Sequence, residues 1–466
     1  MKQRLRVVAN TFFPKGGGSR SALIVSSGHV AGYAVMLAVT PLITRLYGPA
    51  DFGVFAVYTS LVAMLGLISM ASYEVAIPLP EEDSTARGLL ALAIGICLVT
   101  SASVGILVWW AGESLLSKLQ AGELGGLSLV FAVHLVGIGS CEAFTNWFVR
   151  KGNFVAVARA RFVASVVNAL VQVVLVFVIG GAAGLVAGSA AGGIAGGVYL
   201  LFRFCRCHGL PRAESVSALR KVAYRYRRYP QLSMPSNLLQ RTAILVPPLT
   251  LAVFYEPQVV GWYGLAQRAL IVPLSLIGLP LSRVYLVEAS RRHRRGSDQL
   301  RQLFLSTAKK QILYAGVPLF FFVLVAPPLF AVAFGEPWRE AGVYCRFVFP
   351  MLLLYIIATV LAGTLDVLER QDIHLIRSLV LLALMAAGLT VPWCLGTSPA
   401  VAIATLSAAG SAGYLVTIGL VWRAMPNDAG VPMPASEAVA TDRHLHFDPE
   451  MPQHHPKHLR VGDRSA

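Results

Sequence analysis

The chain has 466 residues, of which 56% are hydrophobic and only 13% are charged, and its formal net charge is +16. Soluble domains carry about 25% charged residues, so this composition excludes an ordinary soluble protein. The mean hydropathy is +0.65, and the apolar residues occur in blocks of about 20, the length that spans a bilayer core. The sequence therefore predicts a polytopic membrane protein.

The apolar blocks must form helices, because lipid cannot satisfy exposed backbone groups. We predict an all-α membrane protein with about twelve transmembrane helices. The predicted spans are residues 21–44, 53–77, 88–111, 125–148, 162–180, 184–203, 231–254, 261–286, 312–334, 342–366, 377–396 and 400–422. The first block is too long for a signal peptide and no small-residue cleavage site follows it, so we expect it to be retained.

Lysine and arginine residues between the spans predict the orientation. Segments 1–20, 149–161, 203–228 and 291–310, all on one side of the predicted membrane, hold 24 of them. The other side holds Arg45, Lys118 and Arg339, with Arg346 as a fourth if it is counted. Positively charged loops stay in the cytoplasm, so both termini are predicted to be cytoplasmic. This topology and anionic headgroups account for the net charge, and we do not expect nucleic-acid binding.

A short turn is repeated where the first helix of each half joins the second helix. The equivalent residues, 208 positions apart, are Tyr47 and Tyr255, Pro49 and Pro257, Gly53 and Gly261, and Phe55 and Tyr263. This repeat predicts a duplicated six-helix unit whose two copies share one orientation. We expect the two turns to act as hinges between the lobes.

The predicted domain boundaries follow from this repeat. They are a cytoplasmic N-terminal segment 1–20, an N-terminal six-helix lobe 21–203, a basic cytoplasmic linker 204–230, a C-terminal six-helix lobe 231–422 and a disordered cytoplasmic tail 423–466. The linker can form an amphipathic helix whose basic residues contact anionic headgroups, or it can serve only as a topology anchor. The histidine-rich tail could bind a metal adventitiously.

The segments predicted to lie outside the cell are too short to hold a catalytic domain, so we expect the function to reside in the helix bundle. The phosphate-binding motif G-x-x-x-x-G-K-[ST] is absent from the sequence. The cysteine spacing fits no zinc motif. We therefore predict a transporter that is not an enzyme and uses no cofactor and no metal.

Polar side chains inside the predicted spans are the candidate functional residues, because a charge in lipid costs from about 2.5 to more than 10 kcal/mol. The predicted cationic residues are Arg268, Arg241, Arg45 and His29. The polar residues predicted to line a cavity are Asn237, Gln240, Gln267, Asn168 and Gln172. The carboxylates that could couple transport to an ion are Glu74, Glu142 and Asp366.

Several of these residues have a second interpretation. Arg45, Glu74 and Asp366 lie near predicted span ends and could be interfacial anchors, Glu142 could neutralise an arginine, and His29 could be a packing residue. The two arginines deepest in the predicted spans are harder to explain by packing. Guanidinium groups pair bidentately with phosphate, so we predict an anionic, phosphate-bearing amphiphile as the cargo.

The stretch LYGPADFGVFAVYTSLVAML, followed by SYEVAIPLPEEDSTA, resembles the opening of bacterial polysaccharide-biosynthesis membrane proteins. These are the O-antigen and exopolysaccharide flippases of the multidrug/oligosaccharidyl-lipid/polysaccharide exporter superfamily. YPQLSMPSNLLQ and VVGWYGLAQRALIVPLSLIG resemble the second half of that family. Arg268 and Glu74 match residues that the family pattern usually has, whereas Arg241 and Glu142 depart from it.

The resemblance implies two six-helix lobes around a central cavity in a bacterial inner membrane. It also implies that a polyprenyl-pyrophosphate-linked oligosaccharide is flipped from the inner to the outer leaflet. The implied partners are anionic membrane lipids, a polysaccharide polymerase and a chain-length regulator.

Three alternatives remain from the sequence. A cation-coupled multidrug exporter of the same superfamily would carry a carboxylate in its first helix, but residues 21–44 contain none. A membrane-embedded glycosyltransferase or polymerase would need longer outer loops. A scaffold for polymer-synthesis enzymes would use the basic inner loops and the tail.

Overall fold

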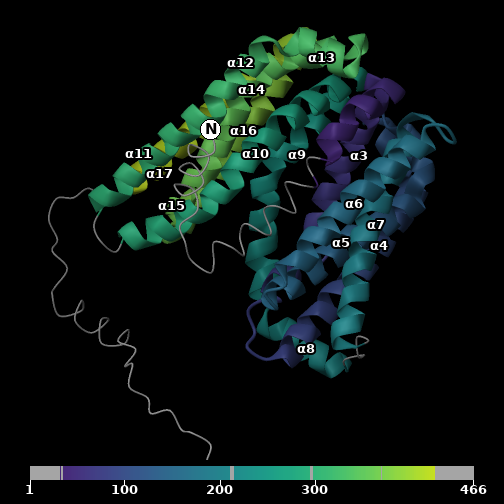
Figure 1. Cartoon of the computed structure of the whole chain (residues 1–466), viewed down its shortest axis with the longest axis vertical. Helices are drawn as coiled ribbons and strands as arrows, with labels where there is room; N and C mark the ends of the chain where they lie inside the picture. Colours follow the sequence, from purple (N-terminus) through teal and green to yellow (C-terminus); the bar gives the residue numbers. More distant parts are fainter. Residues whose placement is uncertain (1–31, 33–34, 210–214, 294–296, 369, 426–466) are drawn as a thin grey trace, which may run out of the picture. The chain divides into compact units, whose positions relative to one another are not determined.

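The computed structural model describes residues 32, 35–209, 215–293, 297–368 and 370–425. In these ranges the chain is all-helical, which confirms the predicted fold class (Figure 1). The helices are α3 (Pro49–Ile68), α4 (Asp83–Ser117), α5 (Ser128–Arg150), α6 (Phe154–Leu175), α7 (Gly181–His208), α8 (Val216–Arg225), α9 (Met234–Phe254), α10 (Pro257–His293), α11 (Ser297–Gln311), α12 (Val317–Leu324), α13 (Ala326–Phe334), α14 (Arg339–Leu361), α15 (Gly363–Val367), α16 (Gln371–Cys394) and α17 (Pro399–Ala424). The segment 1–20 and residues 426–466 of the tail lie outside the described residues.

Each of the twelve predicted spans overlaps a described helix, but not all of these helices are of spanning length. Nine are long and apolar enough to cross a membrane, and a bent pair, Gln299–Leu324 with Ala326–Phe334, forms a tenth candidate. Two shorter apolar helices, Val35–Leu46 and Ile244–Phe254, overlap only part of the first and seventh predicted spans. The chain is therefore a multi-pass membrane protein.

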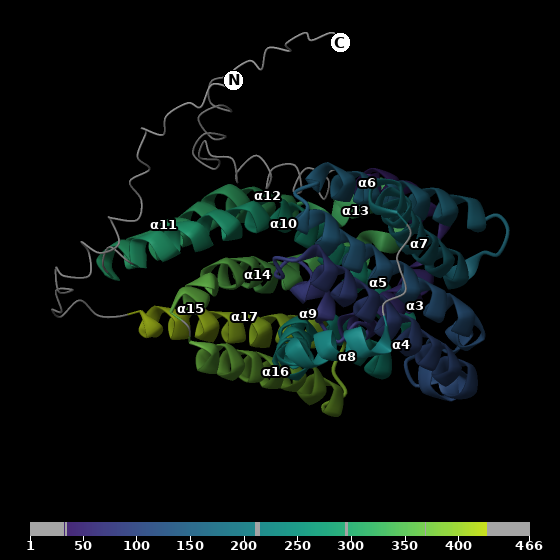
Figure 2. The same cartoon turned by 90° about the horizontal axis from the view of Figure 1, so that it is seen from below.

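Helices α3–α7 form one half of the described bundle and α9–α17 form the other (Figures 1 and 2). Within the first half, α7 packs on both α5 and α6. Within the second half, α14 packs on both α10 and α17. Helix α3 crosses between the halves, because it contacts both α9 and α10. We call the end where α3 and α10 begin the outer end, following the charge-based orientation, and the opposite end the inner end.

Small and polar residues hold α6 against α7. A Cβ atom on Gly192 would lie 2.7 Å from the carbonyl oxygen of Ala164, so only glycine allows this approach of the two helices. Gln172 is 1% exposed, and its amide donates to the carbonyl oxygen of Leu185 at 3.1 Å. The main-chain carbonyl oxygen of Gln172 accepts a hydrogen bond from the Tyr47 hydroxyl at 2.7 Å.

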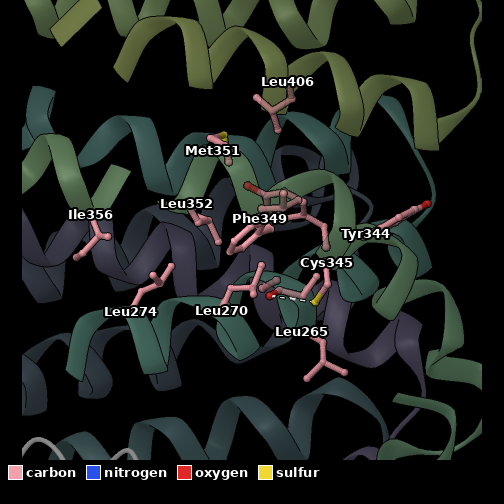
Figure 3. Packing of buried hydrophobic residues seen from close by; sticks show 14 of the residues in the cluster. Leu265, Leu270, Leu274, Tyr344, Cys345, Phe349, Met351, Leu352, Ile356 and Leu406 are labelled. Carbon is pink, nitrogen blue, oxygen red and sulfur yellow. Dashed lines mark hydrogen bonds between the residues drawn. The ribbon is translucent and has the colours of Figure 1, made fainter. Parts of the chain in front are cut away.

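The core of the second half is an apolar contact between α10 and α14. Leu270 and Leu274 on α10 pack with Leu352 and Ile356 on α14 (Figure 3). The thiol of Cys345 donates to a main-chain carbonyl on α10 at 3.7 Å. This contact makes α10 part of a firmly packed half, while its other side faces α3.

A bend of 74° separates α12 from α13. Pro327 and Pro328 have no N–H, so the carbonyl groups four residues earlier, at Val323 and Leu324, lose their helical donors. The side chain of Arg346 on α14 supplies donors instead, from Nε to Val323 O at 3.3 Å and from Nη2 to Leu324 O at 2.6 Å. The bend is therefore a built feature with its polar groups satisfied.

The linker contains the predicted amphipathic helix, α8. Its apolar side packs against the inner end of α4, where a Cβ on Gly88 would lie 3.3 Å from Val222 Cγ2. The hydroxyl of Tyr73 donates to the carbonyl oxygen of Ala223 at 3.2 Å. Arg220 and Lys221 are exposed, so the basic side of α8 is available to headgroups.

Candidate functional site

The two repeated turns meet at the outer end of the bundle. A Cβ atom on Gly53 would overlap the carbonyl oxygen of Pro257, and a Cβ atom on Gly261 would overlap the carbonyl oxygen of Pro49. The contact is therefore reciprocal, because each glycine faces the first residue of the other helix. The sequence led us to expect hinges here, whereas the structure places both turns in the contact between the halves.

Three hydrogen bonds reinforce this outer contact. Trp338 Nε1 donates to Thr44 O at 2.8 Å, Arg45 Nη2 donates to Val332 O at 3.1 Å, and Gln120 Nε2 donates to Tyr255 O at 3.1 Å. The Trp338 ring also packs edge-on against the ring of Phe52, with centroids 4.8 Å apart. Side chains of both halves thus close the outer end in this conformation.

Arg268 lies on α10 at the contact with α3. Its guanidinium carbon is 4.9 Å from the centroid of the Phe55 ring. Phe55 is 3% exposed, and Arg268 is half-buried. Among the ion pairs of the described residues, none includes Arg268. The positive charge is therefore stabilised by a ring face, without a carboxylate.

Arg241 lies on α9, which contacts α3 of the first half and α10 of its own half. Its side chain is exposed, and none of the ion pairs among the described residues includes it. Asn237 lies one turn away and is half-buried, as is Gln267 on α10. Gln240 is also on α9, but its side chain lies outside the described residues.

An apolar groove of about 460 Å³ lies along α10, and Arg268 is not one of its lining residues. On α10 it is lined by Ala269, Val272, Pro273 and Leu276, a stripe that starts at the next residue. Helices α12 and α13 form the opposite wall with phenylalanine and leucine side chains, and Leu37 of the first half completes the lining. Leu37 is 49% exposed, so the groove opens to the surroundings, which are lipid for a membrane protein.

The three predicted carboxylates have different environments. Glu142 accepts a charged hydrogen bond from Arg161 at 2.9 Å. Asp366 lies 3.1 Å from the Nε2 atom of His374. Glu74 lies in the 3₁₀ turn Tyr73–Ala76 after α3, and its Oε2 atom is buried without a hydrogen-bond partner. Burial raises the pKa of Glu74 to about 7, and the charge of Glu142 contributes to this rise.

Two predicted cavity residues lie in helix packing. The Asn168 amide nitrogen is 3.5 Å from the sulfur of Met36, and a Cβ on Gly192 would lie 2.8 Å from Asn168 Cβ. Gln172 is buried between α6 and α7, as described above. Arg45 is part of the outer contact, and His29 lies outside the described residues.

Arg377 and Arg346 were not among the predicted functional residues. The predicted span began at 377, whereas α16 begins at Gln371, so Arg377 lies nearly two turns inside the helix. Arg346 lies within the predicted span 342–366 without a predicted functional role, although the Pro327–Pro328 pair signals carbonyl groups that need donors. Trp338 was also missed, because its partner Thr44 is 294 residues away in the sequence.

A family model for polysaccharide biosynthesis proteins matches residues 42–342. Among curated proteins, none matches the chain. Among solved structures, the lipid II flippase MurJ in an inward closed conformation is similar at 12% identity, with a TM-score of 0.68, over 84% of this chain and 86% of that one.

A multidrug resistance MATE family transporter of the MOP superfamily, in an inward-facing conformation, is similar at 14% identity, with a TM-score of 0.60, over 87% of this chain and 94% of that one. The MATE multidrug transporter DinF-BH in complex with R6G is similar at 16% identity, with a TM-score of 0.57, over 86% and 94%. These likenesses establish the fold, in which two helical lobes form the bundle. Because the family match extends over most of the sequence, the chain belongs to the polysaccharide biosynthesis protein family.

Proposed function

We propose that the protein flips a polyprenyl-pyrophosphate-linked oligosaccharide from the inner to the outer leaflet of the bacterial inner membrane. The observation that carries this proposal is the position of Arg268. Its charge has no carboxylate partner among the described residues, it lies at the contact between the halves, and the apolar lining of a groove on the same helix starts at the next residue, Ala269. A positive charge next to an apolar surface matches an amphiphile with an anionic head and a hydrocarbon chain.

The anionic head would be held by Arg268 together with Arg241. An isolated ionised group faces a barrier of tens of kcal/mol in a medium of low dielectric constant by Born estimates, so compensating cations are needed along the path. Arginine suits a pyrophosphate because its planar fork forms two parallel hydrogen bonds. Asn237 and Gln267 would contact the sugars, since amides both donate and accept.

The hydrocarbon chain would remain in the apolar groove and the surrounding lipid. Val272 lies one helical turn beyond Arg268, on nearly the same side of α10. A phosphate at Arg268 would therefore place the first carbons of its chain against the groove stripe. This arrangement keeps the chain out of water while the head crosses.

The closed outer end supports an alternating-access cycle. Contacts between the two turns block the outer side in this conformation, so release would require the turns to separate. Glu74 would couple this change to protons, because it is the one of the three predicted carboxylates without a described basic partner. The polymerase and the chain-length regulator would act on the released product.

The experiment is export in a strain that lacks the gene and carries it back on a plasmid. The Arg268→Ala/Arg241→Ala double variant should reach the membrane at normal level but reduce surface polysaccharide at least about tenfold, with lipid-linked oligosaccharide accumulating in the inner leaflet. Arg206→Ala, which removes an exposed inner-end charge that stacks on Phe202, is the matched control. Unimpaired export in the double variant would contradict the site assignment, and dye efflux without polysaccharide export would favour the multidrug alternative.

A further inference from the structure

Three polar side chains lie next to one another at the inner end of the second half. Asp366 lies at the end of α15, and His374 and Arg377 lie on α16. The Nε2 atom of His374 is 3.1 Å from Asp366 Oδ1, which is an ion-pair distance, but it makes no hydrogen bond in this geometry. The opposite ring nitrogen, Nδ1, is 3.1 Å from Arg377 Nε and 2.9 Å from an Nη atom of the same guanidinium.

This geometry determines which ring nitrogen carries the proton. A guanidinium has donors only, so His374 Nδ1 must present its lone pair to Arg377. The proton of the neutral ring is then on Nε2, on the side of Asp366. The contact with Arg377 therefore sets the tautomer of His374, and the ring lies between two charged groups of opposite sign.

Arg377 uses this lone pair as the hydrogen-bond acceptor of its guanidinium. Its side chain is half-buried, and an arginine inside a span is costly unless a polar group receives it. Among the described residues, the acceptor recorded for its guanidinium is His374 Nδ1. Its electrostatic neighbours are Asp366 and Tyr414, and the Tyr414 ring lies 5.6 Å from that of Tyr355.

We propose that His374 is a proton-binding site of the second half, and that proton uptake there releases Arg377. A proton from water at the inner end adds to the Nδ1 lone pair, and no covalent bond breaks. The ring then donates from both nitrogens, so Nδ1–H faces the guanidinium donors and two cations are adjacent. Asp366 stays beside Nε2 and offsets the new charge, which leaves Arg377 as the group that must move.

The charged groups around the site favour this response. Asp366 faces the ring from α15, Tyr414 on α17 is an electrostatic neighbour of Arg377, and Tyr355 on α14 packs against Tyr414. At the N-cap of α16, Arg370 is 2.8 Å from Asp372 and is therefore already paired. On α9, which packs against α16, Arg241 is exposed and has no recorded contact with the ring.

This site is independent of Glu74 and of the transported cargo. Glu74 belongs to the first half, whereas His374 belongs to the second, so each half contains a titratable group at its inner end. Helix α16 packs on α9, and α9 contacts α3 of the other half. Movement of Arg377 would therefore begin one helix away from the contact between the halves.

The test is solid-state NMR of the full chain with isotope-labelled histidine and arginine, in bilayers of phosphatidylethanolamine and phosphatidylglycerol. His374→Gln and Arg377→Lys identify the two signals by their disappearance. At pH 8 the ring should carry its proton on Nε2, and acidification should shift the ring and Arg377 Nε signals together. Removing the guanidinium with Arg377→Gln should favour the doubly protonated ring, because an adjacent cation is gone, and Asp366→Asn should disfavour it.

Arg370→Gln is the matched control, because it removes a neighbouring charge of the same sign that Asp372 already balances. It should leave the titration within a few tenths of a pH unit of the native value. A proton on Nδ1 at pH 8, or an Arg377 signal that stays fixed while the ring titrates, would overturn the proposal. Loss or retention of polysaccharide export does not enter this measurement, so the two proposals fail separately.

Discussion

Gly53 and Gly261 face each other where α3 and α10 cross, and a Cβ atom on Gly261 would lie 3.1 Å from the main-chain nitrogen of Gly53. The crossing has no room for a side chain at either of these two positions. The two glycines are equivalent positions of the repeated turn, so the same residue allows the close approach from both sides.

Gly53→Ala and Gly261→Ala should each weaken closure of the outer end. An added methyl group would overlap a proline carbonyl, and such overpacking costs about 1–3 kcal/mol. The readout is Val259→Cys in a Cys394→Ser background, because Val259 is 6% exposed in the closed outer end. A membrane-impermeant maleimide should label this cysteine several-fold faster in the alanine variants. Gly95→Ala is the control, since a Cβ there has no atom within 4 Å, and equal labelling in all variants would contradict the predicted role of the glycines.

Arg346→Gln should destabilise the protein by about 1–3 kcal/mol, because Val323 O and Leu324 O would lose donors in a buried or lipid environment. The measurement is the midpoint of thermal unfolding in detergent. Replacing Pro327 and Pro328 with alanine restores two N–H groups, so the triple variant should recover most of the loss. A double-mutant cycle isolates this coupling. Additive losses from the arginine and proline changes would show that Arg346 does not cap the bend.

Stability should fall as the pH rises through the range in which Glu74 titrates. The pKa of this buried carboxyl is raised from 4.5 to about 7, so the folded state holds its proton more tightly than the unfolded state. The stabilising contribution is therefore complete below about pH 4.5 and is lost as the pH approaches 7, with a slope of at most about 1.4 kcal/mol per pH unit. Unfolding midpoints between pH 5 and 8 measure this slope.

Glu74→Gln should flatten that pH dependence, because a neutral amide binds no proton. Glu113→Gln, at an exposed position of α4, should leave it unchanged. An unaltered slope in the Glu74 variant would assign the titration to another group.

Ala269→Phe should reduce polysaccharide export by filling the groove next to Arg268 while leaving the arginine in place. The expected loss is about tenfold or more, with normal protein level in the membrane. Val332→Phe is the matched control, because Val332 is 75% exposed on α13 and points away from the groove lining. Equal export by the two phenylalanine variants would show that the groove is not part of the transport path.

Much of the fold follows from patterns that are local in the sequence. Apolar blocks of spanning length predict the helices, and a turn such as residues 46–53 predicts where one helix begins, since Pro49 suits the first position of α3. The repeat of this turn predicts the duplication. The mutual contact of Gly53 and Gly261 was not predictable in this way, because no local pattern states which distant segment packs on which.

The candidate site was less predictable for the same reason. Glu74, Glu142 and Asp366 look alike in the sequence, and only the folded chain shows that two of them have basic partners. Arg377 was assigned to a boundary because helix ends are the least certain part of a periodic pattern. Gln172 is polar inside a span, yet it satisfies a carbonyl of the neighbouring helix, a role that periodicity does not distinguish from cavity lining.

The reciprocal crossing has a consequence for the ancestry of the molecule. A contact in which each member touches the other through the same residues is the form of a two-fold interface between identical subunits. A single six-helix protein that dimerised about an axis along the membrane normal would juxtapose its own proline and glycine in this manner. Gene fusion would then preserve this interface as a crossing within one chain. Both copies of the ancestral turn would keep their glycine, because the close approach of the two helices requires it on each side.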